Sequence, residues 1–457
     1  MNEHWSESDD TVRRYQEIDS TLEVQRPIAF LIATNRMFNL EAFCDTLLAS
    51  LRGSRLLEQS YQECSLHLYL ASEKSVPTLL PQRFHEILTY TPLPFDEKGS
   101  NNIGATRKRQ IELAELACVQ LEDPILVVLD DDLTFEALTL RDGQPVKTYP
   151  FSYIHEIYLF AQNHPCDVAL GGVTGAPPLP STSSMRTFLQ DFLGTQSSSK
   201  NTEERWSETD YYYDLSETRT CWQNWPILSS NSDQHCVQLA LNQMFHTSPN
   251  NRPLVYISNE KTPQPRIVRG GNTVVFNPEF LLKIDHPDLP RRGDSLWAIL
   301  ASELGASILD FPYPLYHTRN ADVKITEMQE RSYRKSLEKR MADDLIGAAM
   351  QRAMVNGESV LPIYLGRLEN QLQLVGECLE LLERAKKFID DGSEEQGFWA
   401  MSLKERTSFC DDARNILDSL KLHLKQKINQ VEKTSEMSSL KIKAMRYDAQ
   451  QAMEEGQ

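Results

Sequence analysis

The chain has 457 residues, of which 40% are hydrophobic and 25% are charged, values close to the average for globular proteins. This length predicts two domains rather than one. The 47 basic and 65 acidic residues give a net charge of −18, which argues against nucleic acid as a partner because a polyanion needs a basic surface. A small ligand that carries phosphate is still compatible, since a divalent cation and a few arginines can reverse the potential inside one cleft.

The cysteines and the N-terminal segment indicate the compartment. The eight cysteines are scattered without a C-x-x-C pair, which favours neither a zinc site nor a disulfide framework and is typical of a reducing environment. Residues 1–25 form a polar leader without an apolar core, and no run approaches the roughly 18 apolar residues that cross a bilayer. We therefore expect a cytoplasmic protein without a transmembrane segment; peripheral attachment to a membrane stays open.

Apolar runs alternate with helical spacing in the first third of the chain. The run at 27–35 predicts a buried strand that ends in a loop, the spacing at 39–59 predicts a helix, and residues 64–72 alternate as a strand does. Residues 101–121 predict a second helix and residues 125–129 another buried strand. This order predicts an α/β fold with a parallel sheet covered on both faces, in which ligands bind beyond the carboxyl ends of the strands.

The rest of the chain has a different texture. Residues from about 180 to 265 are rich in Ser, Thr, Asn and Pro with interspersed aromatic residues, which predicts an irregular insertion. Strand-like residues return at 266–277, and residues 286–306 predict a proline-rich loop that enters a helix. We expect the α/β domain to span 26–320. Residues 321–457 predict a helical C-terminal region, which could dimerise the protein, dock a partner or cover an acceptor site.

The strongest chemical signal is an acidic triplet, Asp130, Asp131 and Asp132, directly after the apolar run at 125–129. Adjacent carboxylates at the end of a buried strand repel one another and lose hydration, so a cation is expected nearby. Because side chains alternate along a strand, Asp130 and Asp132 can face the same way and offer two oxygen ligands to Mg²⁺ or Mn²⁺. The alternative is a solvated turn, or the cap of a helix over residues 133–138.

The apolar strand, the D-x-D-type triplet and the flanking elements resemble the GT-A glycosyltransferases over about residues 26–320, nearest to the large inverting group of nucleotide-diphospho-sugar transferases. The resemblance implies a Rossmann-like GT-A fold. It also implies a hexosyltransferase-like enzyme that moves a sugar from a nucleotide-diphosphate donor to an acceptor hydroxyl. In that case Asp130 and Asp132 hold Mn²⁺ or Mg²⁺, and Asp131 lies at the nucleotide sugar. Inversion rests on the resemblance alone, and the nucleotide, sugar and acceptor (glycan, protein or small molecule) are not given.

Several residues match the parts of that family that bind the nucleotide. Thr34, Asn35 and Arg36 resemble a Thr-x-Arg-like turn after the first strand, and Ser72 and Glu73 stand where a small polar or acidic pair approaches the base or ribose. The resemblance therefore implies that the nucleotide sugar lies against the ends of these two predicted strands.

Asn102, Gly104 and Arg107 approximate an Asn-x-Gly-x-x-x-Arg element, with the spacing shortened by one. Asn and Gly let a backbone approach a phosphate or ribose at a helix start, and Arg107 would supply a charge-assisted fork. The alternative is an ordinary capped helix whose basic residues are solvated.

Asp294 and His317 complete the set that the resemblance implies. Asp294 resembles the aspartate of a Glu-Asp motif from which these enzymes take a general base, although Gly293 replaces the preceding acid. His317 stands where some members place a further metal ligand, and a neutral imidazole suits Mn²⁺. The alternatives are an N-cap for Asp294 and a surface or packing role for His317.

Two glycine pairs, Gly171 with Gly172 and Gly270 with Gly271, allow close backbone approach. In the family, a segment ahead of the catalytic acid lines the donor sugar or the acceptor pocket, and we assign Gly271 to it. Either pair could instead be a tight turn or a bulge.

Two other functions compete with the glycosyltransferase. A nucleotidyltransferase would activate a sugar phosphate. A protein that resembles that family has a glycine-rich loop after the first strand, whereas residues 32–40 of this chain contain no glycine. A non-catalytic scaffold with a degenerate transferase domain is disfavoured by the intact acidic triplet. The matching residues occur along the chain in the same order as in the GT-A family, which favours the glycosyltransferase.

Overall fold

The computed structural model describes a little over three fifths of the chain. The described residues are 26–34, 40–51, 66–73, 80–85, 88–95, 103–141, 144–175, 182, 185–186, 189, 222–224, 254–256, 263–265, 271–285, 292–317, 327–390 and 403–454. The predictions for Asn35, Arg36 and Asn102 lie outside them, as does most of the predicted insertion at 180–265.

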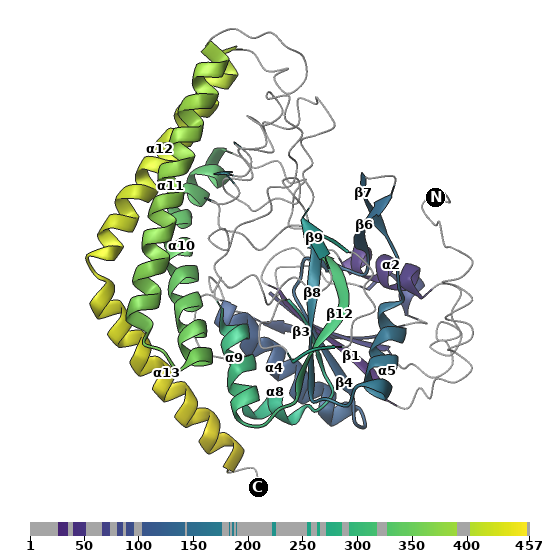
Figure 1. Ribbon diagram of the computed structural model, residues 1–457. Helices are drawn as coiled ribbons and strands as arrows, with labels where there is room; N and C mark the ends of the chain where they lie inside the picture. Colours follow the sequence, from purple (N-terminus) through teal and green to yellow (C-terminus); the bar gives the residue numbers. More distant parts are fainter. Residues whose placement is uncertain are drawn as a thin grey trace.

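A mixed sheet forms the centre of the α/β part (Figure 1). Within the described residues its strands are β1 (Ile28–Thr34), β2 (Leu66–Glu73), β3 (Thr89–Phe95), β4 (Ile125–Leu129), β5 (Leu133–Thr134), β8 (Val168–Gly175), β9 (Trp222–Asn224), β10 (Leu254–Tyr256), β11 (Asn272–Val275) and β12 (Ile308–His317). Their order is β3-β2-β1-β4-β11-β8-β10-β9, and β12 pairs with both β8 and β5. A separate hairpin consists of β6 (Ala137–Arg141) and β7 (Gln144–Thr148).

The prediction of a parallel sheet is right for β3, β2, β1 and β4 and for the pair of β8 with β12, but wrong for the sheet as a whole, which is mixed. β11 runs antiparallel to its neighbours β4 and β8, whereas β12 is parallel to β8. The sequence of a buried apolar strand does not show whether the strand runs parallel or antiparallel to its neighbours, because both of its faces are buried in either case. Strand direction is set by the chain connection and not by the apolar character of the strand.

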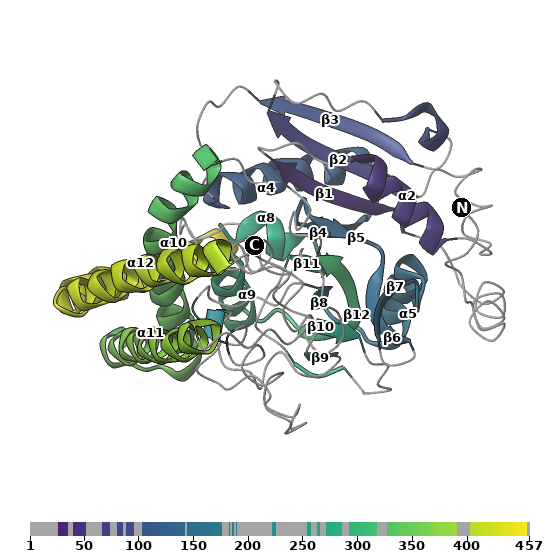
Figure 2. The ribbon, with the colours of Figure 1, turned by 90° about the horizontal axis from the view of Figure 1, so that it is seen from above.

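Helices cover both faces of the sheet, as predicted. They are α2 (Leu40–Ser50), α4 (Ile103–Gln120), α5 (Tyr153–Asn163), α8 (Glu279–Lys283) and α9 (Gly293–Glu303), with a short 3₁₀ turn, η1, at Gln82–Phe84. Figure 2 shows α4, α8 and α9 on one side of the sheet and α2 and α5 on the other. Residues 133–138, the alternative helix after the acidic triplet, instead form β5 and begin β6.

Alternation along the central strands divides the core in two. On β1, Phe30 packs against the aromatic rings of Phe43 and Phe135 on the α2 and α5 side. Its neighbours Ala29 and Leu31 face the α4, α8 and α9 side. All seven residues of β1 are buried, as expected of a strand between two helical layers.

The C-terminal region consists of α10 (Glu327–Asn356), α11 (Val360–Asp390), α12 (Leu403–Ile428) and α13 (Val431–Glu454), which pack side by side (Figure 1). Their apolar residues share one core with Trp297 and Leu300 of α9. The last of these helices, α13, has a buried face. In the described part of the chain, no helix is both long and apolar enough to cross a bilayer.

Candidate functional site

The acidic triplet lies where β4 ends, beside the end of β1. The Asp130 amide donates to the Gly271 carbonyl oxygen at 3.0 Å, which extends the pairing of β4 with β11 by one residue. The Thr34 hydroxyl, at the end of β1, donates to the carboxylate of Asp131. The triplet is therefore fixed by both neighbouring strands at the carboxyl edge of the parallel strands, which is where the sequence predicts a ligand.

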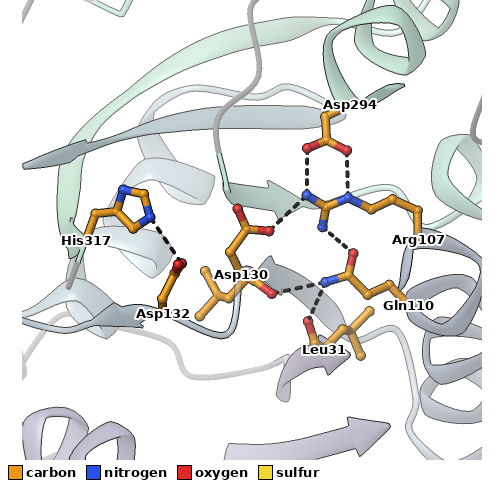
Figure 3. Close-up of polar contacts among 8 residues, drawn as sticks. Leu31, Arg107, Gln110, Asp130, Asp132, Asp294 and His317 are labelled. Carbon is orange, nitrogen blue, oxygen red and sulfur yellow. Dashed lines mark hydrogen bonds and ion pairs between the residues drawn. The ribbon is translucent and has the colours of Figure 1, made fainter. Parts of the chain in front are cut away.

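Arg107 lies between Asp130 and Asp294 (Figure 3). Its Nε and Nη2 donate to the two oxygens of Asp294, each at 2.6 Å, and Nη2 also donates to Asp130 Oδ1 at 2.9 Å. Its Nη1 donates to Gln110, whose amide in turn reaches the Leu129 carbonyl oxygen at 3.0 Å. Every nitrogen of this guanidinium is therefore directed at the protein itself.

This arrangement corrects both predictions for Arg107. The side chain is only 5% exposed, so it is neither a solvated surface residue nor a fork directed at a phosphate. Burial by itself would lower the pKa of the Arg107 guanidinium, but the charges of Asp294 and Asp130 outweigh that effect and raise its pKa. Arg107 is a permanent internal cation that links α4 to the end of β4 and to the start of α9.

Asp294 lies in the first turn of α9 and is not the N-cap that the alternative predicted. The N-cap is Arg292, in the left-handed region at φ 68°. A carboxylate in a first turn still interacts favourably with the helix dipole. Each oxygen of a carboxylate has two lone pairs, so Asp294 retains acceptor capacity beyond its two bonds to Arg107.

His317, at the end of β12, is paired with Asp132. Its Nε2 lies 3.2 Å from Asp132 Oδ1, and each side chain is 14% exposed. The backbone of His317 is paired with Leu133 of β5, which brings the histidine to the acidic triplet. The structure thus joins two residues that are far apart in the sequence, and the surface alternative for His317 is wrong.

The predicted metal trio of Asp130, Asp132 and His317 is not assembled. In the part of the chain that the structure describes, no three acidic, histidine or cysteine side chains are arranged to hold a metal ion. Asp130 is instead paired with Arg107, an internal cation. The remaining pair suits a divalent ion, because two adjacent ligands of an octahedral ion lie about 3 Å apart and a carboxylate with an imidazole matches Mn²⁺.

Gly271 lies directly against the side chain of Asp130. A Cβ atom built there would lie 2.1 Å from Asp130 Oδ2, so a side chain would displace that carboxylate. Its neighbour Asn272 is fully buried and accepts a hydrogen bond from the Tyr153 hydroxyl at 2.5 Å. The backbone of Gly271 therefore lies close to the acidic triplet, and the hydrogen bond of Asn272 to Tyr153 holds this segment in place.

Gly271→Ala should destabilise the protein by about 1 to 3 kcal/mol, because the added methyl group overlaps Asp130. Gly376→Ala in α11 is the matched control: nothing lies within 4 Å of a Cβ there, and alanine should stabilise the helix by up to about 1 kcal/mol. Urea denaturation of both variants measures this. Equal stability of Gly271→Ala and the unchanged protein would contradict the proximity of Gly271 to Asp130.

Sequence reasoning missed three residues that hold the site, namely Gln110, Tyr153 and Asn272. Of the residues assigned to the nucleotide, Thr34 contacts the triplet. Ser72 is buried at the end of β2 next to Thr34, and Glu73 closes that strand. Gly171 lies so close to Asn272 that a Cβ would meet its amide nitrogen at 2.3 Å.

The sequence was also compared with known proteins. Neither the models of protein families nor the curated proteins give a match to this chain.

Proposed function

We propose that the protein is a metal-dependent glycosyltransferase of the GT-A type, which transfers a sugar from a nucleotide diphosphate to an acceptor hydroxyl. One observation carries the proposal: residues from four segments of the chain converge at the carboxyl edge of the sheet. Asp132 is paired with His317, and Asp130 is joined to Asp294 through Arg107. The parallel strands β3-β2-β1-β4 are compatible with the Rossmann-like half of such a fold.

The side chains suggest separate roles. Asp132 and His317 would hold Mn²⁺ or Mg²⁺, and the bound ion would neutralise the diphosphate and favour its departure. Asp131, oriented by Thr34, would face the nucleotide sugar. Asp294 would accept the proton of the acceptor hydroxyl as that oxygen attacks the anomeric carbon, which gives inversion.

Arg107 has a different part from the one that the resemblance implies. It holds Asp294 by two hydrogen bonds and so fixes the direction in which this carboxylate can meet an acceptor. A base that is held in place before the substrate arrives loses less entropy in the transition state. The cation also reduces the repulsion among the carboxylates that surround an anionic donor.

The first test is donor hydrolysis. Purified protein with Mn²⁺ should slowly hydrolyse at least one nucleotide sugar, seen as released nucleotide by mass spectrometry, and Asp132→Ala should abolish this because the metal pair is lost. The control is Asp411→Ala, which removes an aspartate paired with Lys386 on the C-terminal helices. Undiminished hydrolysis by Asp132→Ala would contradict the proposal.

A second readout separates the enzyme from the scaffold. The glycosyltransferase should show a Mn²⁺-dependent increase in melting temperature with UDP, GDP, CDP or dTDP, because a ligand that binds only the folded state stabilises it. No shift with any of the four would favour the scaffold.

A further inference from the structure

α13 exposes an apolar stripe on its outer side. Met437, Leu440 and Tyr447 are 64%, 61% and 65% exposed, although large apolar residues are usually buried. With exposed Ala444 between them, they follow spacings of three and four residues, which place all four on one face of a helix. This alternating spacing is the heptad pattern of a coiled-coil seam.

The opposite face of α13 holds the helix in place. Val431, Ser435, Ser438, Ile442 and Ala449 are buried against the rest of the protein. Arg446 pairs with Glu303 of α9. The outer stripe therefore belongs to a helix that is already formed, and a partner that binds it does not need to order it.

The charges beside the stripe are arranged for a second copy of the same helix. If Met437 and Ala444 are a positions and Leu440 and Tyr447 are d positions, then Glu436 and Lys443 are g positions. Lys441 and Asp448 are then e positions. In a parallel pair each g residue faces the e residue five positions later in the other helix. Glu436 would then face Lys441, and Lys443 would face Asp448, so both contacts join opposite charges.

We propose that the protein forms a homodimer through a parallel coiled coil of α13 with the α13 of a second copy. Two-fold symmetry repeats both charge contacts, which gives four favourable pairs along the seam. The stripe brings Met437, Leu440, Ala444 and Tyr447 into contact with their own counterparts.

The overall charge of α13 favours a second copy over an anionic membrane. A helix that lies on such a membrane carries an excess of basic residues. α13 instead has four basic and four acidic residues: Lys433, Lys441, Lys443 and Arg446 with Glu432, Glu436, Asp448 and Glu454. The helix is therefore neutral and attracts an equally patterned helix more than a lipid surface.

The seam from Met437 to Tyr447 is only about 15 Å long at 1.5 Å per residue. Such an interface is at the small end for specific association. We therefore expect a reversible dimer whose population rises with concentration. Sedimentation velocity from about 1 to 100 μM, a range that includes micromolar dissociation constants, should show the monomer converting to dimer.

Substitutions at two equally exposed leucines, one inside and one outside the stripe, test whether the stripe forms the dimer contact. Leu440 on α13 and Leu422 on α12 are both 61% exposed. Leu440→Glu should leave a monomer at every concentration, and Leu422→Glu should dimerise as the unchanged protein does. A protein that is monomeric throughout, or a Leu440→Glu variant that still dimerises, would overturn the proposal.

The parallel register is tested by charge reversal. Glu436→Lys with Lys443→Glu makes both contacts repulsive in its own dimer, and so does Lys441→Glu with Asp448→Lys. Each double variant leaves the net charge unchanged and should be monomeric. An equimolar mixture should dimerise again, because all four contacts then join opposite charges. Failure of the mixture to dimerise would reject the parallel arrangement. If the protein that carries only Leu440→Glu still forms dimers, the contact lies elsewhere.

Discussion

Arg107→Met should destabilise the protein by about 3 to 5 kcal/mol, the cost of removing one partner from a buried ion pair. The change removes the only cation that Figure 3 shows between Asp130 and Asp294 and leaves these two carboxylates without the charge of the guanidinium. Because the Asp130 side chain is 40% exposed, solvent screens part of the repulsion, and the lower end of the range is expected. Urea denaturation at neutral pH measures the loss.

Two further variants separate the effect of the positive charge of Arg107 from the effect of its guanidinium geometry. Arg107→Lys keeps the cation but cannot form the two-bond fork with Asp294, so it should lie between Arg107→Met and the unchanged protein. Adding Asp294→Asn to Arg107→Met should recover part of the lost stability, because it removes one uncompensated charge. If Arg107→Met alone changed stability by less than about 1 kcal/mol, the ion-pair account of Arg107 would be wrong.

Asp294→Asn should lower sugar transfer by about 10²-fold to 10⁴-fold, the usual contribution of a positioned general base. Donor binding should not change, because Asp294 belongs to the acceptor side of the proposed reaction. The asparagine oxygen can still accept one hydrogen bond from Arg107, so the fold should survive. Turnover is followed by mass spectrometry of the product, and donor affinity by calorimetry with Mn²⁺ present.

The comparison of turnover with affinity identifies the role of Asp294. Loss of turnover with unchanged donor affinity indicates a group that acts only in the transition state. Loss of both would indicate that Asp294 serves only to hold Arg107 and the acidic triplet. Retained transfer would remove Asp294 from the proposed mechanism.

Much of the fold could be predicted from local patterns. The strands β1 and β4 and the helices α2 and α4 have strong periodicity and lie within the ranges predicted from it, and β2 extends one residue beyond its predicted range, to Glu73. The antiparallel direction of β11 could not be predicted, because residues 272–275 are apolar enough for a buried strand of either direction. Strand direction depends on contacts between distant segments, which periodicity does not record.

Some residues of the candidate site could also be predicted from the sequence, and others could not. Asp132 could be nominated because it follows a predicted buried strand, where ligands gather. Asp294 and His317 could be nominated from the resemblance to the GT-A family. The contact of Arg107 with Asp294 could not, because it joins α4 to α9 across the sheet edge. Gln110 gives no local signal either, since it reads as an ordinary residue of an amphipathic helix until its amide is seen to reach the Leu129 carbonyl oxygen.

The most direct test of the proposed site is an anomalous diffraction map from crystals soaked with Mn²⁺ and UDP. The proposal predicts a manganese peak within about 2.3 Å of Asp132 and His317, with the diphosphate bound to the same ion. A peak elsewhere, or none although nucleotide is bound, would contradict a metal-dependent glycosyltransferase at this edge of the sheet.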